Sequence, residues 1–152
     1  MGNKMTVGSL EACDLPELNI KGLHARIDTG AKTSSLHVDN IVEKRVNKAK
    51  WVCFDIHPDI SDVGKRVTRE ARVKKRRTIK SSNGASERRY LIETEITMGG
   101  NTWPIEVTLT DRSDMTYLML LGRQAMVGRI IVDPEFTYLV SEGVSGPDEE
   151  QD

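Results

Sequence analysis

The chain has 152 residues, of which 38% are hydrophobic and 30% are charged, and its formal net charge is -1. These values are typical of one globular domain that buries a core without disulfide or metal support. No apolar run approaches the ~20 residues of a membrane-spanning helix and no signal-type segment opens the chain, so we expect a cytoplasmic protein without membrane contact. Cys13 and Cys53 indicate neither a disulfide framework nor a structural zinc cluster.

The N-terminal half of the chain predicts short strands. Alternating apolar residues or β-branched and aromatic content indicate strands at residues 5–12, 20–28 and 51–56. Residues 36–42 alternate less regularly, and the polar residues 43–50 indicate a turn or a hairpin connection. Residues 59–72 are polar and weakly patterned, so we expect an irregular connection there.

A long hairpin is predicted in the middle of the chain. Asn83-Gly84 lies between two extended segments, residues 72–80 and 86–98, and an Asn-Gly pair in this position is a strong hairpin signal. Residues 103–110 then alternate as a half-buried strand does, and Pro104 favours a sheet edge at the start of that strand.

The C-terminal part predicts three more strands and one short helix. Residues 117–122 are almost wholly apolar, which fits a short strand buried on both faces. Residues 122–127 predict a brief helix, and residues 130–132 and 136–140 predict strands. Many short strands separated by turns favour an all-β barrel or sandwich.

The domain boundaries follow from composition. We place one domain at residues 7–141, after a flexible N-terminus of residues 1–6. Residues 142–152 are acidic and contain Gly and Pro, so we expect a disordered tail there.

The basic residues are concentrated in the middle of the chain. Between Lys65 and Arg89, eleven Lys and Arg residues stand against two Glu residues, a local balance of +9. A charged segment is often only a solvated face, but a bias of this size favours an acidic partner such as a peptide, a phosphate group or a nucleic acid. Nucleic acid ranks lowest, because Tyr90 is the only aromatic residue among these charges.

The segment Asp28-Thr29-Gly30-Ala31 is the first candidate site. The strand of residues 20–28 delivers a carboxylate at its end, and Gly30 permits a tight turn before apolar residues resume at Leu36. Asp-Thr-Gly is also ordinary turn chemistry, because Asp accepts backbone hydrogen bonds. The triplet alone therefore does not distinguish a catalytic loop from a structural turn.

Three features in chain order resemble one subunit of a retropepsin-like aspartic protease. They are the Asp28 loop, the hairpin with Asn83-Gly84 at its tip, and the apolar strand that ends at Leu121-Gly122 before a short helix. They correspond to the catalytic loop, the flap and the strand that braces the catalytic loop. The sequence also resembles the bacterial RimB-like family, labelled ATP-dependent zinc proteases, in residues 25–36, 81–84, 103–106 and 109–124.

The RimB-like resemblance covers about residues 7–140 and implies an all-β, closed acid-protease-like (retropepsin-like) barrel with a flap hairpin and one short helix. It implies that Asp28 is catalytic and that Thr29 forms hydrogen bonds across a pair of loops, although Thr29 could instead cap its own turn. The residues that support the catalytic loop would be Thr29, Gly30, Ala31, Leu121 and Gly122.

A single candidate Asp has a consequence for the assembly. Aspartic proteolysis uses two carboxyl groups that share a proton: one activates water as a base, and the other donates to the scissile carbonyl. A chain with one such loop must pair with a second copy about a two-fold axis, which places Asp28 beside its symmetry mate. We therefore expect an aspartic-type peptidase that is active as a homodimer and needs no cofactor.

The resemblance places the flap at about residues 72–91, and this flap is far more basic than that of compact viral retropepsins. Because Arg and Lys pair with carboxylates, we expect an acidic, glutamate-rich peptide as the substrate. The expected substrate-binding residues are Ser82, Asn83, Gly84, Arg76, Arg77 and Arg88. The resemblance also implies an association with the ATP-grasp ligase that adds glutamates to a ribosomal protein.

Two alternatives stay open. The domain could be a non-catalytic module that binds an acidic protein or regulates a glutamate ligase. It could also be a zinc protease, as the family label says, with a site built from scattered residues such as His24, His37 and Cys53. The sequence contains neither a phosphate-binding loop nor a His-Glu-x-x-His motif, so we expect no metal and no direct use of ATP.

Overall fold

The computed structural model describes residues 3–57, 65–80, 84–111 and 117–141. Its elements are β1 (Met5–Val7), β2 (Leu10–Leu15), η1 (Pro16–Leu18), β3 (Ile20–Ile27), β4 (Ser34–His37), β5 (Asp39–Val46), β6 (Ala49–Ile56), β7 (Val67–Lys80), β8 (Ser86–Met98), β9 (Asn101–Thr110), β10 (Met119–Leu121), η2 (Arg123–Ala125) and β11 (Ile130–Val132). Neither of the short helices in these ranges is long or apolar enough to cross a membrane.

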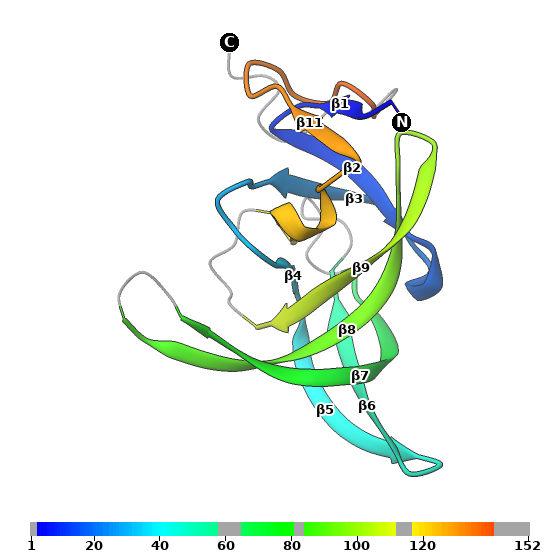
Figure 1. Ribbon diagram of the computed structural model, residues 1–152. Coiled ribbons are helices and arrows are strands. Elements are labelled where there is room, and N and C mark those ends of the chain that lie inside the picture. Colours follow the sequence, from blue (N-terminus) through cyan, green and yellow to red (C-terminus); the bar gives the residue numbers. More distant parts are fainter. Residues whose placement is uncertain (1–2, 58–64, 81–83, 112–116, 142–152) are drawn as a thin grey trace.

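Six strands close into a barrel. The order is β2-β3-β10-β4-β9-β8, and a pairing of Asp14 on β2 with Thr97 on β8 closes the circle. Apolar residues that alternate along the strands fill the interior, and Leu23, Leu36 and Ile96 are fully buried there. The predicted all-β closed barrel is therefore confirmed (Figure 1).

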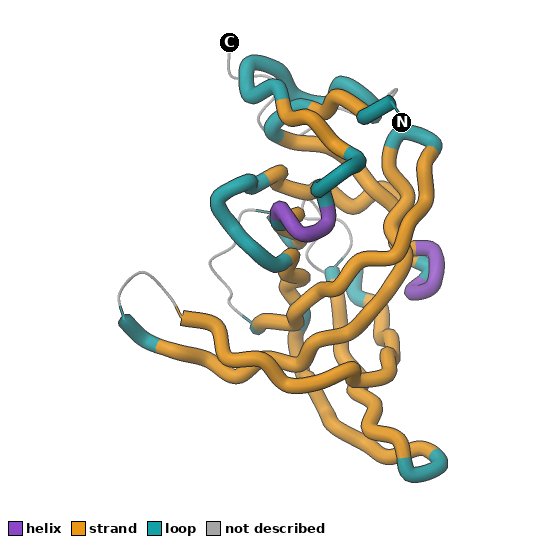
Figure 2. The backbone as a smooth tube through the Cα atoms, viewed as in Figure 1, coloured by secondary structure: helices purple, strands orange, loops and turns teal. Residues whose placement is uncertain are grey.

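The remaining long strands extend the sheet outward from β8. The second half of β7 pairs with β8, its first half pairs with β6, and the register shifts between Val73 and Lys75. Strand β5 forms the outer edge of this sheet. The β7–β8 hairpin projects from the barrel beneath the loop that joins β3 to β4, toward the left of the view (Figure 2). The β5–β6 hairpin ends at the lower right of Figure 2. The predicted hairpin of residues 72–80 and 86–98 is thus confirmed.

Two predicted connections are shorter than expected, because strands occupy part of each. Most of residues 43–50 belongs to β5 and β6, and only Asn47 and Lys48 form the turn, both with positive φ. In the predicted irregular region 59–72, strand β7 begins at Val67, and residues 58–64 lie outside the described part of the chain. The reason is tertiary: pairing with β6 and burial of Ala71 set this strand, whereas its sequence is dominated by charged residues.

The predicted last strand at residues 136–140 is wrong. Two backbone N–H groups of this segment, at Leu139 and Val140, donate to the Glu11 carboxyl group instead of to a neighbouring strand. Tyr138 has φ +55°, which interrupts an extended conformation. The segment therefore lies against β2 as an irregular strap.

The buried Glu11 side chain holds this strap. It is fully inaccessible to solvent, and its two oxygens accept four hydrogen bonds at 2.6 to 3.2 Å. The donors are the Gly8, Leu139 and Val140 N–H groups and the Ser141 hydroxyl. The Glu11 side chain thus joins β2 and Gly8 to residues 139–141.

The two cysteines differ in their surroundings, which gives a testable difference in reactivity. Cys13 is buried on β2, and burial raises the pKa of its thiol to about 12, whereas Cys53 on β6 is half-buried. Because the thiolate is the reactive form, we expect iodoacetamide at pH 8 to modify Cys53 at least about 100-fold faster than Cys13. Peptide mass spectrometry of timed samples measures the two rates. Equal rates in the folded protein would contradict the expectation, and unfolding in urea should make the rates similar.

Candidate active site

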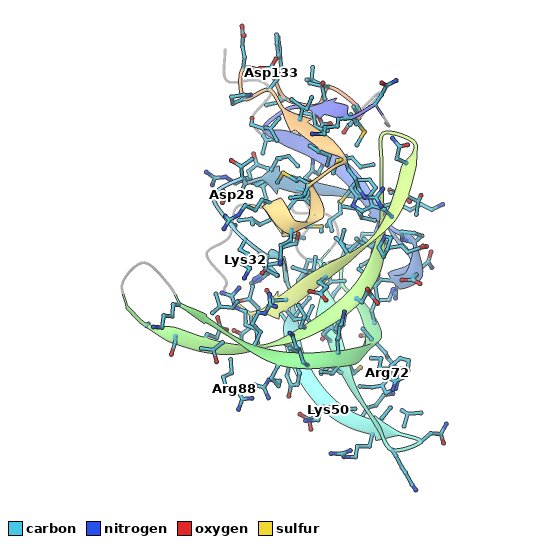
Figure 3. The ribbon with its side chains drawn as sticks, viewed as in Figure 1. Asp28, Lys32, Lys50, Arg72, Arg88 and Asp133 are labelled. Atoms are coloured by element: carbon cyan, nitrogen blue, oxygen red, sulfur yellow. The ribbon has the colours of Figure 1, made fainter. Side chains whose placement is uncertain are left out.

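The Asp28 loop begins directly after β3. The Asp28 N–H donates to the Leu121 carbonyl at 2.9 Å, so the loop starts in register with β10. The Gly30 N–H donates to Asp28 Oδ1 at 2.9 Å, and the Ala31 N–H donates to the Asp28 carbonyl at 3.2 Å. These bonds turn the loop and orient a half-buried carboxyl group. Asp28 and Lys32 lie on the same side of the barrel, above the β7–β8 hairpin (Figure 3).

Gly122 braces the loop from behind. Its N–H donates to Ser34 Oγ at 3.0 Å, and a Cβ atom added at Gly122 would lie 2.6 Å from the Thr33 carbonyl carbon. Only a residue without a side chain permits the two backbone segments to approach so closely. Leu121 and Gly122 therefore lie against the two ends of the Asp28 loop.

Arg123 holds the same loop from the other end. Its N–H donates to the Ala31 carbonyl at 2.8 Å, and its Nη1 donates to the carbonyls of Gly30 at 3.2 Å and Thr29 at 3.4 Å. The carbonyl groups of the exposed turn thus have a fixed cation beside them. The sequence carries no signal for this role, because the contact joins residues more than ninety positions apart.

A cavity of about 840 Å³ lies between the loop and the β7–β8 hairpin. Gly30 and Ala31 line it, whereas Asp28 is not among the lining residues and is joined to them by the hydrogen bond from the Gly30 N–H to its carboxyl group. Among the described residues, the charged side chains that line it are all cations: Arg26, Lys32, Arg77, Lys80 and Arg89. Leu120 also lines the cavity. Strand β10, which the sequence predicts to be buried on both faces, is therefore partly exposed on one face. The cavity can accept an anionic ligand next to a carboxyl group.

The predicted flap arginines lie on both faces of the hairpin. Arg77 lines the cavity, and its Nη1 donates to Thr33 Oγ1 at 3.0 Å. Arg76 faces the other way, because side chains alternate along a strand, and its guanidinium lies 4.1 Å from the centre of the Tyr90 ring. Arg88 is exposed and points away from Asp28 and Lys32 (Figure 3). Of these three predicted residues, the structure brings Arg77 to the cavity.

Arg89 is, with Lys80, one of two cavity cations of the hairpin that the sequence did not predict. It lies directly opposite Arg77 in the β7–β8 ladder and lines the same cavity. Its Nε donates to Glu87 Oε1 at 2.8 Å. A one-residue change of register exchanges the faces of a strand, so the sequence alone could not choose between Arg88 and Arg89.

The predicted flap tip is described only at its end. Ser82 and Asn83 lie outside the described residues, whereas Gly84 is exposed and has φ +88°. A positive φ of this kind is what an Asn-Gly turn requires. The pairing of Lys80 with Ser86 brings the two arms together on either side of the tip.

One acidic residue near Arg77 is already engaged. Lys74 Nζ lies 2.6 Å from Glu106 Oε2, and this hydrogen bond lowers the pKa of Glu106 and raises the pKa of Lys74. The positive charges of Arg77 and Lys75 lower the Glu106 pKa further. Glu106 is therefore held as an anion by Lys74, outside the lining of the cavity.

Each of the three histidines lies beside a polar side chain of another residue. His24 Nδ1 lies 3.1 Å from the Tyr138 hydroxyl, and His57 Nε2 lies 2.9 Å from Asp39 Oδ2. His37 Nε2 lies 3.8 Å from the other oxygen of Asp39. Within the described ranges, no three His, Cys, Asp or Glu side chains are grouped as a metal site. The described residues thus do not assemble the alternative site of His24, His37 and Cys53.

Comparison with known proteins agrees with this geometry. Residues 6–142 match the family model described as RimB-like, retropepsin-like aspartic endopeptidase RimB. A crystal structure of a Legionella pneumophila protein of unknown function superimposes with a TM-score of 0.76 at 28% identity, covering 92% of this chain and 100% of that one.

Curated relatives carry a different name. A "probable alpha-L-glutamate ligase" of Parasynechococcus marenigrum is 44% identical over 142 residues, which is 93% of this chain and 30% of the relative. A protein of the same name from Shewanella pealeana is 46% identical over 141 residues, which is 92% of this chain and 31% of the relative. The chain thus spans about 30% of the length of these relatives. The family match over nearly all of the chain shows that it belongs to the RimB-like family of retropepsin-like aspartic endopeptidases.

Proposed function

We propose that two copies of this chain form an aspartic-type peptidase that hydrolyses acidic, glutamate-rich peptides, with Asp28 of each copy in the active site. The observation that carries the proposal is an oriented carboxyl group bonded to Gly30, which lines a cavity whose charged lining residues, in the described part of the chain, are all cations. Family membership supports the peptidase chemistry, and the cations support the acidic substrate.

The mechanism needs one Asp28 as a carboxylate and the other as a carboxylic acid. The carboxylate removes a proton from water, whose oxygen attacks the peptide carbonyl carbon. The carboxylic acid donates its proton to the carbonyl oxygen, which gives a neutral tetrahedral diol. Breakdown of the diol transfers a proton to the leaving nitrogen and returns the pair to its starting state. One chain supplies one carboxyl group, so the site is complete only in the dimer.

The acidic substrate connects with the names of the relatives. Relatives named glutamate ligase that match this domain suggest a function near glutamate-rich chains. The RimB-like resemblance implies that such chains are those added to a ribosomal protein. A basic cavity attracts such chains and places them near Asp28, and this attraction weakens as salt increases. Cleavage of a lysine-rich peptide of equal length should accordingly be much slower.

Replacing Asp28 by asparagine tests the chemistry. Because asparagine cannot accept the proton of water, we expect kcat/KM for a fluorogenic glutamate-rich peptide to fall by about 1000-fold or more. The matched control is Asp133→Asn, because Asp133 lies at the end of the molecule opposite the β7–β8 hairpin (Figure 3). Equal cleavage by Asp28→Asn and the unchanged protein would reject the proposed function.

Sedimentation at the assay concentrations tests the dimer. Activity should increase with the dimer fraction, and mixed dimers that contain one Asp28→Asn copy should be inactive, because each site needs both carboxyl groups. Full activity in a strictly monomeric sample would disprove a site made by two copies.

A second candidate function is a module that binds an acidic protein and regulates a glutamate ligase. The observation that favours it is that the relatives are named ligases and are about three times as long as the matched domain. Regulation of a glutamate ligase that depends on Arg76 and Arg77 and is unchanged in Asp28→Asn, together with no cleavage of the glutamate-rich peptide by the unchanged protein, would select this function. The peptidase proposal expects the opposite dependence on Asp28.

A further inference from the structure

We propose that Arg77 and Arg89 act as a pair that binds one carboxylate of the substrate in the cavity beside the Asp28 loop. The inference rests on the proposed function in that it takes this cavity as the substrate site. It adds the identity of the residues that select the substrate, and its test measures peptide binding and not cleavage.

The first support is the position of the two arginines. Their Cα atoms are direct partners across the β7–β8 ladder, and both side chains line the same cavity. Like charges at directly opposed positions destabilise a pair of strands. An anion between them relieves this repulsion, and a guanidinium group can bind both oxygens of a carboxylate at once.

The second support is that each arginine is held in place by another residue. Arg77 Nη1 donates to Thr33 Oγ1 at 3.0 Å, and Thr33 Oγ1 in turn donates to Gln124 Oε1 at 3.3 Å. Arg89 is held through Nε by Glu87 at 2.8 Å, and its side chain is only 12% exposed. Both guanidinium groups are therefore ordered before a ligand arrives, which reduces the entropy lost on binding.

The link through Thr33 also relates the pair to the chemistry. Thr33 belongs to the loop that begins at Asp28, and its backbone packs against Gly122. A substrate carboxylate bound by Arg77 therefore lies a fixed number of peptide residues from the bond that is cleaved. The pair would accordingly select one acidic position of the peptide, and not negative charge in general.

The nearby acids do not fill this role. Glu87 contacts Arg89 through Nε, and Glu106 is bound by Lys74 at 2.6 Å. Neither acid is among the residues that line the cavity. Among the described residues, no acid contacts the Nη groups of Arg89 or the guanidinium of Arg77, so an external carboxylate can bind them.

The test measures peptide binding to the Asp28→Asn protein, which holds substrate without cleaving it. The probe is a fluorescent peptide with four consecutive glutamates, an acetylated start and an amidated end, and variants replace each glutamate by glutamine in turn. We expect Arg77→Gln and Arg89→Gln each to weaken binding by about 10-fold to 100-fold. Each should also abolish the preference for glutamate over glutamine at one and the same peptide position.

Two further variants separate the pair from general electrostatic attraction. Arg77→Lys keeps the charge but loses the planar fork, so it should still weaken binding by about 10-fold or more. Arg72→Gln removes an exposed charge from β7 that lies far from Asp28 (Figure 3), and it should change binding by less than about 2-fold. Thermal melting confirms that each variant is folded.

Comparing a peptide with an amidated C-terminus and one with a free C-terminus shows whether the bound carboxylate is a side chain or the terminus. A side-chain carboxylate predicts the arginine dependence with the amidated peptide, whereas a terminal carboxylate predicts it only when the end is free. Either result supports a carboxylate site.

Three results would overturn the proposal: equal losses in Arg72→Gln and Arg77→Gln, glutamine variants that keep both the preference for glutamate and the preference for a free end, or no binding of either peptide by the protein that has both arginines. None of these results would contradict the proposed peptidase function, whose test is cleavage that depends on Asp28. Conversely, binding by the pair without any cleavage would reject the peptidase and leave the pair intact.

Discussion

Replacing Glu11 by alanine is expected to lower the free energy of unfolding by about 4 kcal/mol or more, close to the limit for a single substitution. The substitution removes the acceptor for three backbone N–H groups and the Ser141 hydroxyl. Each buried donor that is left without a partner costs about 1 to 3 kcal/mol, and Glu11 is fully buried. Urea unfolding followed by tryptophan fluorescence measures the loss.

The matched control is Glu135→Ala, because Glu135 is an exposed carboxylate in the same C-terminal part of the chain. Its effect should stay within about 0.5 kcal/mol. Glu11→Gln should also be strongly destabilising, since one of its two acceptor oxygens becomes an NH₂ group that faces donors. Limited proteolysis should cut the Glu11→Ala protein first near residues 136–141. A loss below about 1 kcal/mol would show that water or a shifted backbone satisfies these donors.

The parts of the site that the sequence predicts have short local signals. Asp28 ends an alternating strand, Gly84 completes an Asn-Gly turn with a positive φ, and Gly122 ends a short apolar run. Each signal depends on neighbours in the chain, and the order of the three resembled a retropepsin-like aspartic protease. The confirmed barrel and hairpin follow from these signals.

The parts that the sequence could not predict depend on contacts between distant segments. Strand β7 begins earlier than its composition suggests because β6 pairs with it. The choice of Arg89 over Arg88 for the cavity depends on register, which no single strand specifies. Glu11 lies in the predicted opening strand, yet three of its four hydrogen-bond partners lie about 130 positions away.

The remaining polar contacts of the site follow the same rule. Arg123 reaches the carbonyls of Thr29 and Gly30, and Arg77 reaches Thr33, across 44 to 94 positions of sequence. Local pattern therefore identifies the loop that carries the carboxyl group, while the fold determines which cations surround it. This division explains why charge counting indicated an acidic ligand but named only one arginine of the proposed pair.

Replacing Gly122 by alanine is expected to reduce kcat/KM for the glutamate-rich peptide by about 100-fold and stability by about 2 kcal/mol. The new Cβ would lie 2.6 Å from the carbonyl carbon and 2.8 Å from the carbonyl oxygen of Thr33. Both neighbours are backbone atoms, so the Asp28 loop or β10 must shift. Asp28 would move as well, because its N–H binds the carbonyl of the adjacent Leu121.

The control for this substitution is Gly100→Ala in the β8–β9 turn. Gly122 has φ -91° and ψ 169°, which alanine adopts without strain, so its expected effect comes only from crowding. Gly100 has φ +82° and no atom within 4 Å of an added Cβ, so its effect comes only from backbone strain. Gly100→Ala should therefore cost about 1 kcal/mol of stability and leave cleavage unchanged. If both variants lost stability but kept full activity, the contact between Gly122 and Thr33 would support the fold without positioning Asp28.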